Sequence, residues 1–266
     1  MLKKKRSIQN KNNHFRLNNS FVGKNFTTEG SYFMWSKPWI MTQIWQDVLF
    51  LHWPISPNEI EPYIPQELQL DLYENNAWLS VVLFKVKGQR LRFLPPFPGM
   101  DSYLQLNVRT YVTYNGMKGI YFFNLDVTNR FIVQIATKAS LSYRHSKISL
   151  KQRGNHFSFT SLHHGALAER LKISYQPISS AIMSSTLEKW LVERYHSWSK
   201  WKNSLFRIDI SHMPWQLQRV NIDIVSNTLA PFVNETTKGI HPIAHYSKIQ
   251  KARIYPPIVE IKNQLY

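Results

Sequence analysis

The chain has 266 residues, of which 43% are hydrophobic and 14% aromatic, and it contains no cysteine. This is enough apolar material for one large domain or two small ones, and it excludes disulfides and zinc sites built on thiolates. The formal net charge is +17, so nucleic acid and anionic membrane have to be considered as partners. After residue 34 the basic residues are dispersed, without a basic helix, a zinc-finger pattern or an RNP-type aromatic motif. We therefore interpret them as a solvated surface and do not expect a nucleic-acid partner.

The first 33 residues form a distinct segment by composition. They are rich in Lys, Asn and Ser, hold seven basic residues against one acid, and show no sustained hydrophobic period. Such a segment predicts a disordered basic extension. It contains no apolar core of a secretory signal, and the chain has no apolar run of the roughly 18 residues that a membrane-spanning helix needs. We expect a cytoplasmic protein with a single folded domain over 34–266, and Met34 is a second candidate for the start of translation.

Two long strands are predicted at the beginning of this domain. Continuous apolar runs over 46–55 and 77–87 indicate buried strands. Between them, 56–59 matches a capping box with proline at the first helical position. This pattern predicts a short helix over 57–63.

The segment 103–113 alternates with the period of a strand. Its even positions are mostly aliphatic, whereas its odd positions are polar or amphipathic and include Gln105, Asn107 and Arg109. An Asn-Gly turn predicts a hairpin with a return strand over 119–127. On an open sheet the odd face would be solvated, but in a closed sheet it would line a cavity, with Arg109 as a fixed charge for an anionic or carbonyl ligand. The sequence leaves both alternatives open.

The rest of the chain is predicted as short strands with two helices. One helix is expected over 130–138, and another follows the capping box of Ser185 and Glu188. Further strands are expected over 142–150, 155–162, 170–175, 205–210, 218–225 and 251–254. Strands outnumber helices by about three to one, without the βαβ alternation of a parallel sheet. The sequence therefore predicts an α+β fold with a mostly antiparallel sheet or barrel.

No motif for catalysis or metal binding stands out. His163 and His164 are adjacent, so they point to opposite faces of a strand, and His52 and His212 are isolated. There is no serine-nucleophile, phosphate-binding or dinucleotide-binding motif, and no pair of carboxylates at a suitable spacing. We expect neither a metal ion nor a cofactor. A Schiff-base nucleophile remains open, with three candidates beside apolar residues: Lys85, Lys138 and Lys147.

Seven segments together resemble a known family. They are Phe50 to Ile55, Ala77-Trp78, Leu94 to Gly99, Leu106 to Val112, Gly119 to Phe123, Leu191 to Tyr195 and His212 to Trp215. They occur in the family's order within residues 41–258, and on this basis the chain is identified as a member of the YqjF-like family of uncharacterised bacterial proteins. That family is distantly similar to the acetoacetate decarboxylase-like superfamily.

The resemblance implies a cone-shaped, mostly antiparallel β-barrel around a hydrophobic pocket, with a few short peripheral helices. In the decarboxylases a Pro-Lys-Lys run supplies the Schiff-base lysine, and the matching place here is 142–144, with Tyr143 at the nucleophile position. A tyrosine cannot form an imine, so Schiff-base chemistry is not implied. The family tends to have glutamate where this chain has Gln105. Because 41–48 contains no arginine, the substrate-binding cation would be Arg109 or Arg144.

Our leading hypothesis is a pocket in this barrel that binds a small carbonyl or carboxylate molecule, either without reaction or with catalysis that needs no imine. The expected ligand-binding residues are Gln105, Asn107, Arg109, Tyr143, His52 and Trp53. A buried arginine needs an anion or several hydrogen-bond acceptors. A ligand carboxylate is one solution, and an internal carboxylate such as Asp126 is the alternative.

Two hypotheses from other classes stay open. One is a Schiff-base lyase that uses a displaced lysine such as Lys147. The other is a basic protein that docks on anionic membrane or nucleic acid. An oligomer is compatible with the sequence, which does not determine the oligomeric state.

Overall fold

The computed structural model describes residues 38–262 except 97, 139–142, 166–167, 234–236 and 238. The predicted extension over 1–33 and the candidate start at Met34 lie outside the described residues. In the described part of the chain, short helices accompany a sheet of 14 strands. None of the helices described is both long and apolar enough to cross a membrane.

The helices are α1 (Pro57–Ile60), the following 3₁₀ helix η1 (Glu61–Tyr63), α2 (Arg130–Lys138) and α3 (Thr186–Val192). The strands are β1 (Met41–Ile55), β2 (Gln69–Leu70), β3 (Ala77–Leu91), β4 (Ser102–Tyr114), β5 (Met117–Val127), β6 (Tyr143–His145), β7 (Lys147–Arg153), β8 (His156–His164), β9 (Ala168–Ala181), β10 (His196–Trp201), β11 (Ser204–Ser211), β12 (Gln218–Asn227), β13 (Ile243–Ile254) and β14 (Ile258–Lys262).

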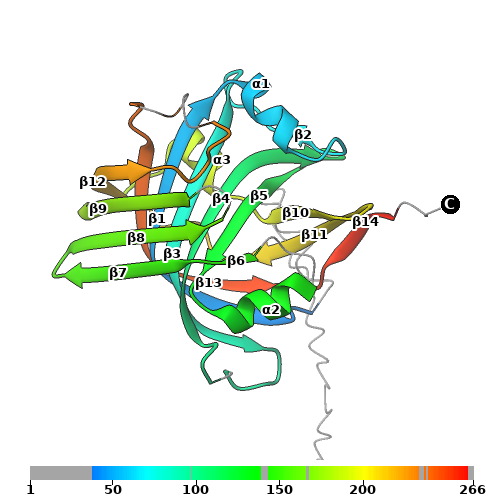
Figure 1. The fold of residues 1–266 in the computed structure, drawn as a ribbon, viewed down its shortest axis with the longest axis horizontal. Coiled ribbons are helices and arrows are strands. Elements are labelled where there is room, and N and C mark those ends of the chain that lie inside the picture. Colours follow the sequence, from blue (N-terminus) through cyan, green and yellow to red (C-terminus); the bar gives the residue numbers. More distant parts are fainter. Residues whose placement is uncertain are drawn as a thin grey trace, which may run out of the picture.

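Seven of the described strands pair into a closed ring. Their order is β11, β10, β5, β4, β3, β1 and β13, and β13 pairs again with β11. The pairs are antiparallel except β5 with β10, and both this pairing and that of β11 with β13 involve only two residues on each strand. Beyond β13 the sheet continues through β12, β9, β8 and β7, which form a layer beside the ring (Figure 1).

The central strands of the ring are buried on both faces, so they separate two cores. Leu51, Val81 and Val108 point outward and pack against aromatic and aliphatic side chains of β8 and β9. Phe50 and Val82 point inward, into a second core that also contains residues of α3. This arrangement follows from strand alternation, and it places the polar odd face of β4 inside the ring.

A bulge in β1 changes the side-chain phase of that strand. The register shifts between Gln46 and Leu49, and Asp47 has a φ of 53°. A bulge adds one residue to a strand, so inward positions are odd before it and even after it. Trp45 and Phe50 therefore share the inner face, whereas Trp53 lies on the outer face.

The predicted helices and most predicted strands are present, but some boundaries were wrong. Strands β10 and β14 were missed. The segment 142–150 is divided between β6 and β7, and β9 continues through Pro177 to Ala181.

Only one of the two predicted capping boxes forms. Ser185 accepts a hydrogen bond from the Glu188 amide at 3.2 Å, and its own amide donates to Glu188 Oε2 at 2.6 Å. Ser56 makes no side-chain cap, although helix α1 still begins at Pro57. Helix α3 ends at Val192, and β10 begins at His196.

Gly119 allows one of the short contacts that close the ring. It lies on β5 immediately before the residues that pair with β10. A Cβ atom at this position would overlap the backbone oxygen of His196 and the ring of Trp198. The pairing of β5 with β10 therefore depends on a residue without a side chain.

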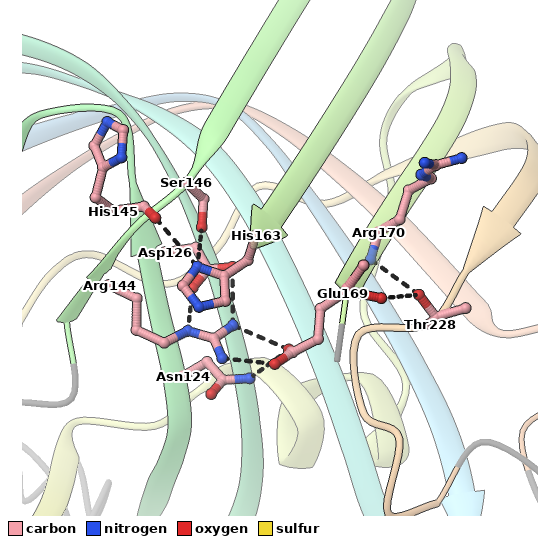
Figure 2. Close-up of polar contacts among 10 residues, drawn as sticks. Asn124, Asp126, Arg144, His145, Ser146, His163, Glu169, Arg170 and Thr228 are labelled. Atoms are coloured by element: carbon pink, nitrogen blue, oxygen red, sulfur yellow. Dashed lines mark hydrogen bonds and ion pairs between the residues drawn. The ribbon is translucent and has the colours of Figure 1, made fainter. Parts of the chain in front are cut away.

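Arg144 joins the ring to the outer layer (Figure 2). From β6 its guanidinium donates to both carboxylate oxygens of Asp126 on β5, at 2.7 and 3.1 Å. It also donates to both carboxylate oxygens of Glu169 on β9, at 2.7 and 3.0 Å. Burial alone would lower the pKa of Arg144, but the hydrogen bonds with the two carboxylates raise it. Asp126 is fully buried, so this charge pair is sheltered from solvent.

We predict that Arg144→Met lowers the free energy of unfolding by about 3 kcal/mol or more, because it leaves the buried Asp126 carboxylate without a counter-ion. The measurement is urea unfolding at neutral pH. The control is Lys200→Met, which breaks the more accessible pair with Glu67 and should cost at most about 1 kcal/mol. Equal effects of the two substitutions would contradict the prediction.

Candidate ligand-binding pocket

The inside of the ring contains a hollow of about 140 Å³. All seven ring strands contribute to its lining, together with Tyr143, the residues that follow α3 and the segment after β11. An apolar cavity of about 150 Å³ is large enough to hold benzene, so this hollow can accommodate a small organic molecule. Its aromatic lining comprises Trp45, Phe50, Phe84, Phe122 and Trp215.

Arg109 brings a positive charge into this hollow from the middle of β4. Arg109 is only 8% exposed, and its Nε and Nη2 atoms are buried without a hydrogen-bond partner. Burial lowers the pKa of Arg109, and the nearby Tyr111 hydroxyl opposes this effect. In the described part of the chain no carboxylate forms an ion pair with it, and the Phe50 ring lies 6.0 Å from its guanidinium carbon.

Two amide side chains extend the polar face beside Arg109. Gln105 donates from Nε2 to Oδ1 of Asn107 at 2.8 Å, and both residues line the hollow. This bond fixes the orientation of the Asn107 amide, because its oxygen is engaged and its Nδ2 group is left to donate elsewhere. The pair can therefore donate hydrogen bonds to a carbonyl oxygen in the hollow.

Tyr143 lines the same hollow from β6. Burial raises the pKa of Tyr143 to about 12, although a hydrogen bond with Gln105 acts to lower it. Its hydroxyl is therefore protonated at neutral pH and acts as a hydrogen-bonding group. The structure thus brings together four of the six residues expected to bind a ligand, Gln105, Asn107, Arg109 and Tyr143; their binding role stays a prediction.

His52 does not line the hollow, contrary to expectation. It is fully buried, and its Nδ1 lies 3.0 Å from the hydroxyl of Tyr111, which itself donates to the Leu191 carbonyl. Because the only hydroxyl proton of Tyr111 is used in that way, Nδ1 of His52 must carry the donated proton. Its Nε2 is buried without a partner, on the row that His52 shares with Ser80 and Arg109 across β1, β3 and β4.

Trp53, which was also expected among the ligand-binding residues, lies outside this hollow. Consecutive residues of a strand point to opposite faces, and the inner face at this level belongs to His52. Trp53 packs in the outer core, and its Nε1 donates to the backbone oxygen of Ile240 at 3.0 Å. Trp45 and Trp215 provide the tryptophan surfaces of the hollow instead.

The other charged candidates from the sequence do not line the hollow. Arg144 is held by two carboxylates and does not line the hollow, and Asp126 is engaged by Arg144, so it is not the internal partner of Arg109. Lys147 is exposed at the start of β7. No lysine, aspartate or glutamate occurs among the described residues that line the hollow.

A second arginine, Arg194, lines the hollow but is neutralised. Its Nη1 lies 2.6 Å from Asp71, and its Nε donates to the Trp190 carbonyl at 2.7 Å. Its guanidinium carbon also lies 4.3 Å from the Trp190 ring centroid. Arg109 and Arg194 thus differ in their partners, and the excess positive charge of the hollow belongs to Arg109.

Sequence reasoning missed His212 as a residue of this hollow. It follows β11, and its ring lies 5.0 Å from Trp215 and 6.0 Å from Trp45. The His212 to Trp215 segment had been part of the family resemblance, which was the one available signal. No pattern within the sequence brings residue 212 beside β4, because that contact depends on closure of the ring.

We predict that the stability of the fold decreases as the pH falls below 6.5, because burial holds the pKa of His52 well below that value. The unfolded chain then binds a proton that the folded chain does not, so this contribution is complete above pH 6.5 and is lost below it, at up to about 1.4 kcal/mol per pH unit. His52→Asn keeps a donor for Tyr111 without a titrating ring and should reduce the slope. Urea unfolding at several pH values measures the slope, and an unchanged slope in the variant would refute the assignment to His52.

Comparisons with known proteins identify the family of this chain. A model of the family DUF2071, described as an uncharacterized conserved protein, matches residues 42–251. The uncharacterized protein YqjF of Bacillus subtilis is 36% identical over 221 residues, which cover 82% of this chain and 91% of that protein.

Similar solved structures share the fold at low sequence identity. An acetoacetate decarboxylase-like enzyme from Sphingomonas wittichii has a TM-score of 0.61 at 11% identity, covering 84% of this chain and 93% of that one. The enduracididine biosynthesis enzyme MppR complexed with pyruvate has 0.59 at 9%, covering 90% and 97%. Acetoacetate decarboxylase from Legionella pneumophila has 0.59 at 12%, covering 85% and 89%. The expected family and its structural relationship are confirmed: this chain belongs to the DUF2071 family of uncharacterized conserved proteins and has an acetoacetate decarboxylase-like fold.

Proposed function

We propose that this protein binds a small carboxylate or carbonyl compound in the hollow and that Arg109 is the residue that recognises its anionic group. The single observation that supports this proposal most is the pair of unpartnered donors on a buried guanidinium that has no carboxylate among the described residues. An uncompensated buried charge costs several kcal/mol. A ligand carboxylate would provide the missing charge and accept the guanidinium hydrogen bonds.

The remaining lining supports a ligand with one polar and one apolar end. The Nδ2 group of Asn107, whose side-chain oxygen is engaged by Gln105, is placed to donate to a carbonyl oxygen. Trp45, Phe84 and Trp215 provide the apolar surface. In this proposal the ring of strands is a conical barrel that encloses the ligand.

Two observations support a mechanism without a Schiff base. Tyr143 occupies the position at which the resemblance places the nucleophile, and the described lining contains no lysine. The structural neighbour MppR is complexed with pyruvate, which makes small 2-oxo acids the first compounds to test.

Two alternatives have less support. A lyase with a displaced lysine would need that lysine in the hollow, but Lys147 is exposed on the outer layer. Docking on membrane or nucleic acid through the basic surface would not require an unpartnered arginine inside the ring. We therefore favour a small-molecule ligand, and the cytoplasmic location stays a prediction.

Replacement of Arg109 by methionine tests the proposal. A thermal-shift screen of pyruvate, acetoacetate, benzoate and their amides should find carboxylates that stabilise the wild-type protein. Arg109→Met should weaken their binding by at least about 30-fold, as expected when one partner of a buried charge pair is lost. The same variant should be more stable than wild type without ligand, because the uncompensated charge is gone.

The matched control is Arg207→Met. Arg207 is also buried, but it pairs with Asp209 and Glu260 at 2.9 and 2.6 Å and does not line the hollow. Its loss should destabilise the protein and leave ligand affinity unchanged. The proposal is wrong if no carboxylate stabilises the wild-type protein, or if Arg109→Met binds carboxylates as tightly as wild type.

A further inference from the structure

The hydrogen bond made by His212 defines which of its nitrogens can accept a proton. Its Nδ1 lies 2.8 Å from the backbone oxygen of Met213. A carbonyl oxygen only accepts, so Nδ1 carries the proton and the lone pair of the neutral ring is on Nε2. No hydrogen bond engages Nε2 within the described part of the chain, and Nε2 is not among the buried atoms that lack a partner.

The ring of His212 is held in place by its neighbours. Tyr195 and Trp215 have ring centroids 4.8 and 5.0 Å from it. The segment that carries it is fixed by a hydrogen bond from Gln250 to the Met213 carbonyl at 2.6 Å, and by one from the Trp215 amide to Glu193 at 2.8 Å. The position of Nε2 therefore does not depend on a bound ligand.

The surroundings of His212 keep it neutral. Burial lowers its pKa, and the positive charge of Arg109 on β4 lowers it further. The bond to the Met213 carbonyl and the negative charge of Glu193, which follows α3, oppose this change. The net effect is a pKa below 6.5, so the ring is a base at neutral pH.

Comparison with the other lining groups leaves His212 as the available base. The described lining contains no carboxylate and no lysine. Arg109 and Arg194 do not deprotonate in proteins, and Tyr143 keeps its proton because its pKa is raised to about 12. Among the described residues of the hollow, only His212 therefore offers a ring nitrogen that is unprotonated at neutral pH and free to accept a proton.

We propose that His212 is the general base that removes a proton from the carbon next to the carbonyl group of a bound 2-oxo acid. This inference rests on the proposed binding of the ligand carboxylate by Arg109. The C–H bond breaks, its electron pair forms the carbon–carbon double bond of the enolate, and the carbonyl π pair moves onto the oxygen. Nε2 takes the proton, and the Asn107 amide donates to the enolate oxygen.

The step needs no co-reactant. The proton on His212 exchanges with solvent, and reversal of the step returns a solvent proton to the carbon. In D₂O the net result is replacement of hydrogen by deuterium at that carbon, with the 2-oxo acid otherwise unchanged. Proton exchange at carbon is thus a direct readout of the base.

The experiment follows the methyl signal of pyruvate by proton NMR in D₂O with the full-length protein. The wild-type protein should accelerate loss of the signal over buffer, at a rate that rises with pH through the lowered pKa of His212 and then levels off. His212→Asn keeps an amide donor for the Met213 carbonyl but lacks the base. It should lose about 100-fold or more of the exchange rate while a thermal-shift titration shows that it still binds pyruvate.

His163→Asn is the matched control. The Nδ1 of His163 also donates to a backbone oxygen, that of His145 at 3.1 Å, but His163 lies on β8 outside the hollow. Its exchange rate should equal that of wild type. Borohydride reduction with pyruvate, read by intact mass, should give no adduct.

Three results would overturn the inference and leave pyruvate binding by Arg109 in place. They are wild-type exchange no faster than in buffer although pyruvate binds, wild-type exchange rates in His212→Asn, and a pyruvate adduct on a lysine. If neither pyruvate nor any other carboxylate of the screen binds, the proposed function and this inference fail together.

Discussion

An arginine that has no acidic partner in the described part of the chain, enclosed by a ring of strands, is the constraint on which the interior of this protein depends. Arg109 is positioned by β4, whose outward side chains are packed as firmly as its inward ones. The strand therefore cannot rotate to release the guanidinium to solvent. Burial is the main cause that lowers the pKa of His52 and His212, and the positive charge of Arg109 adds to that effect.

Other buried or half-buried arginines show how this chain usually compensates such a charge. Arg144, Arg194 and Arg207 each have at least one carboxylate within 2.7 Å. The carboxylates thus pair with the arginines that stabilise the fold. None of the described residues that line the hollow is acidic. Among the described residues, Arg109 has no such carboxylate, and this difference is what the proposed binding role rests on.

The sequence was sufficient to predict the strand character of 103–113 and the side on which its polar residues lie. It could not show that this side is enclosed, because closure depends on β10 and on two pairings of only two residues each. The expectation that Trp53 lies in the pocket failed for a local reason. The bulge at Asp47 reverses the phase of β1, and alternation then assigns the inner face to Phe50 rather than to its odd-numbered neighbours.

The place of His212 in the hollow could not be predicted from the sequence, for a different reason. It is distant from β4 in sequence, and its role as a base depends on a backbone hydrogen bond that no residue pattern encodes. The family resemblance located Tyr143 correctly in the hollow, but it could not show that Arg144 beside it is occupied by two carboxylates. Alternation and resemblance therefore placed most of the polar lining, whereas charge partners required the three-dimensional structure.

Closure of the ring requires that position 119 carries no side chain, which only glycine provides. The backbone of β10 occupies the volume that any side chain at this position would need. A methyl group there would force β5 and β10 apart at one of the two shortest pairings of the ring, and water would then reach Ile120 and Ser197, which line the hollow. Exclusion of water from the surroundings of Arg109 thus depends in part on a residue that does not line the hollow.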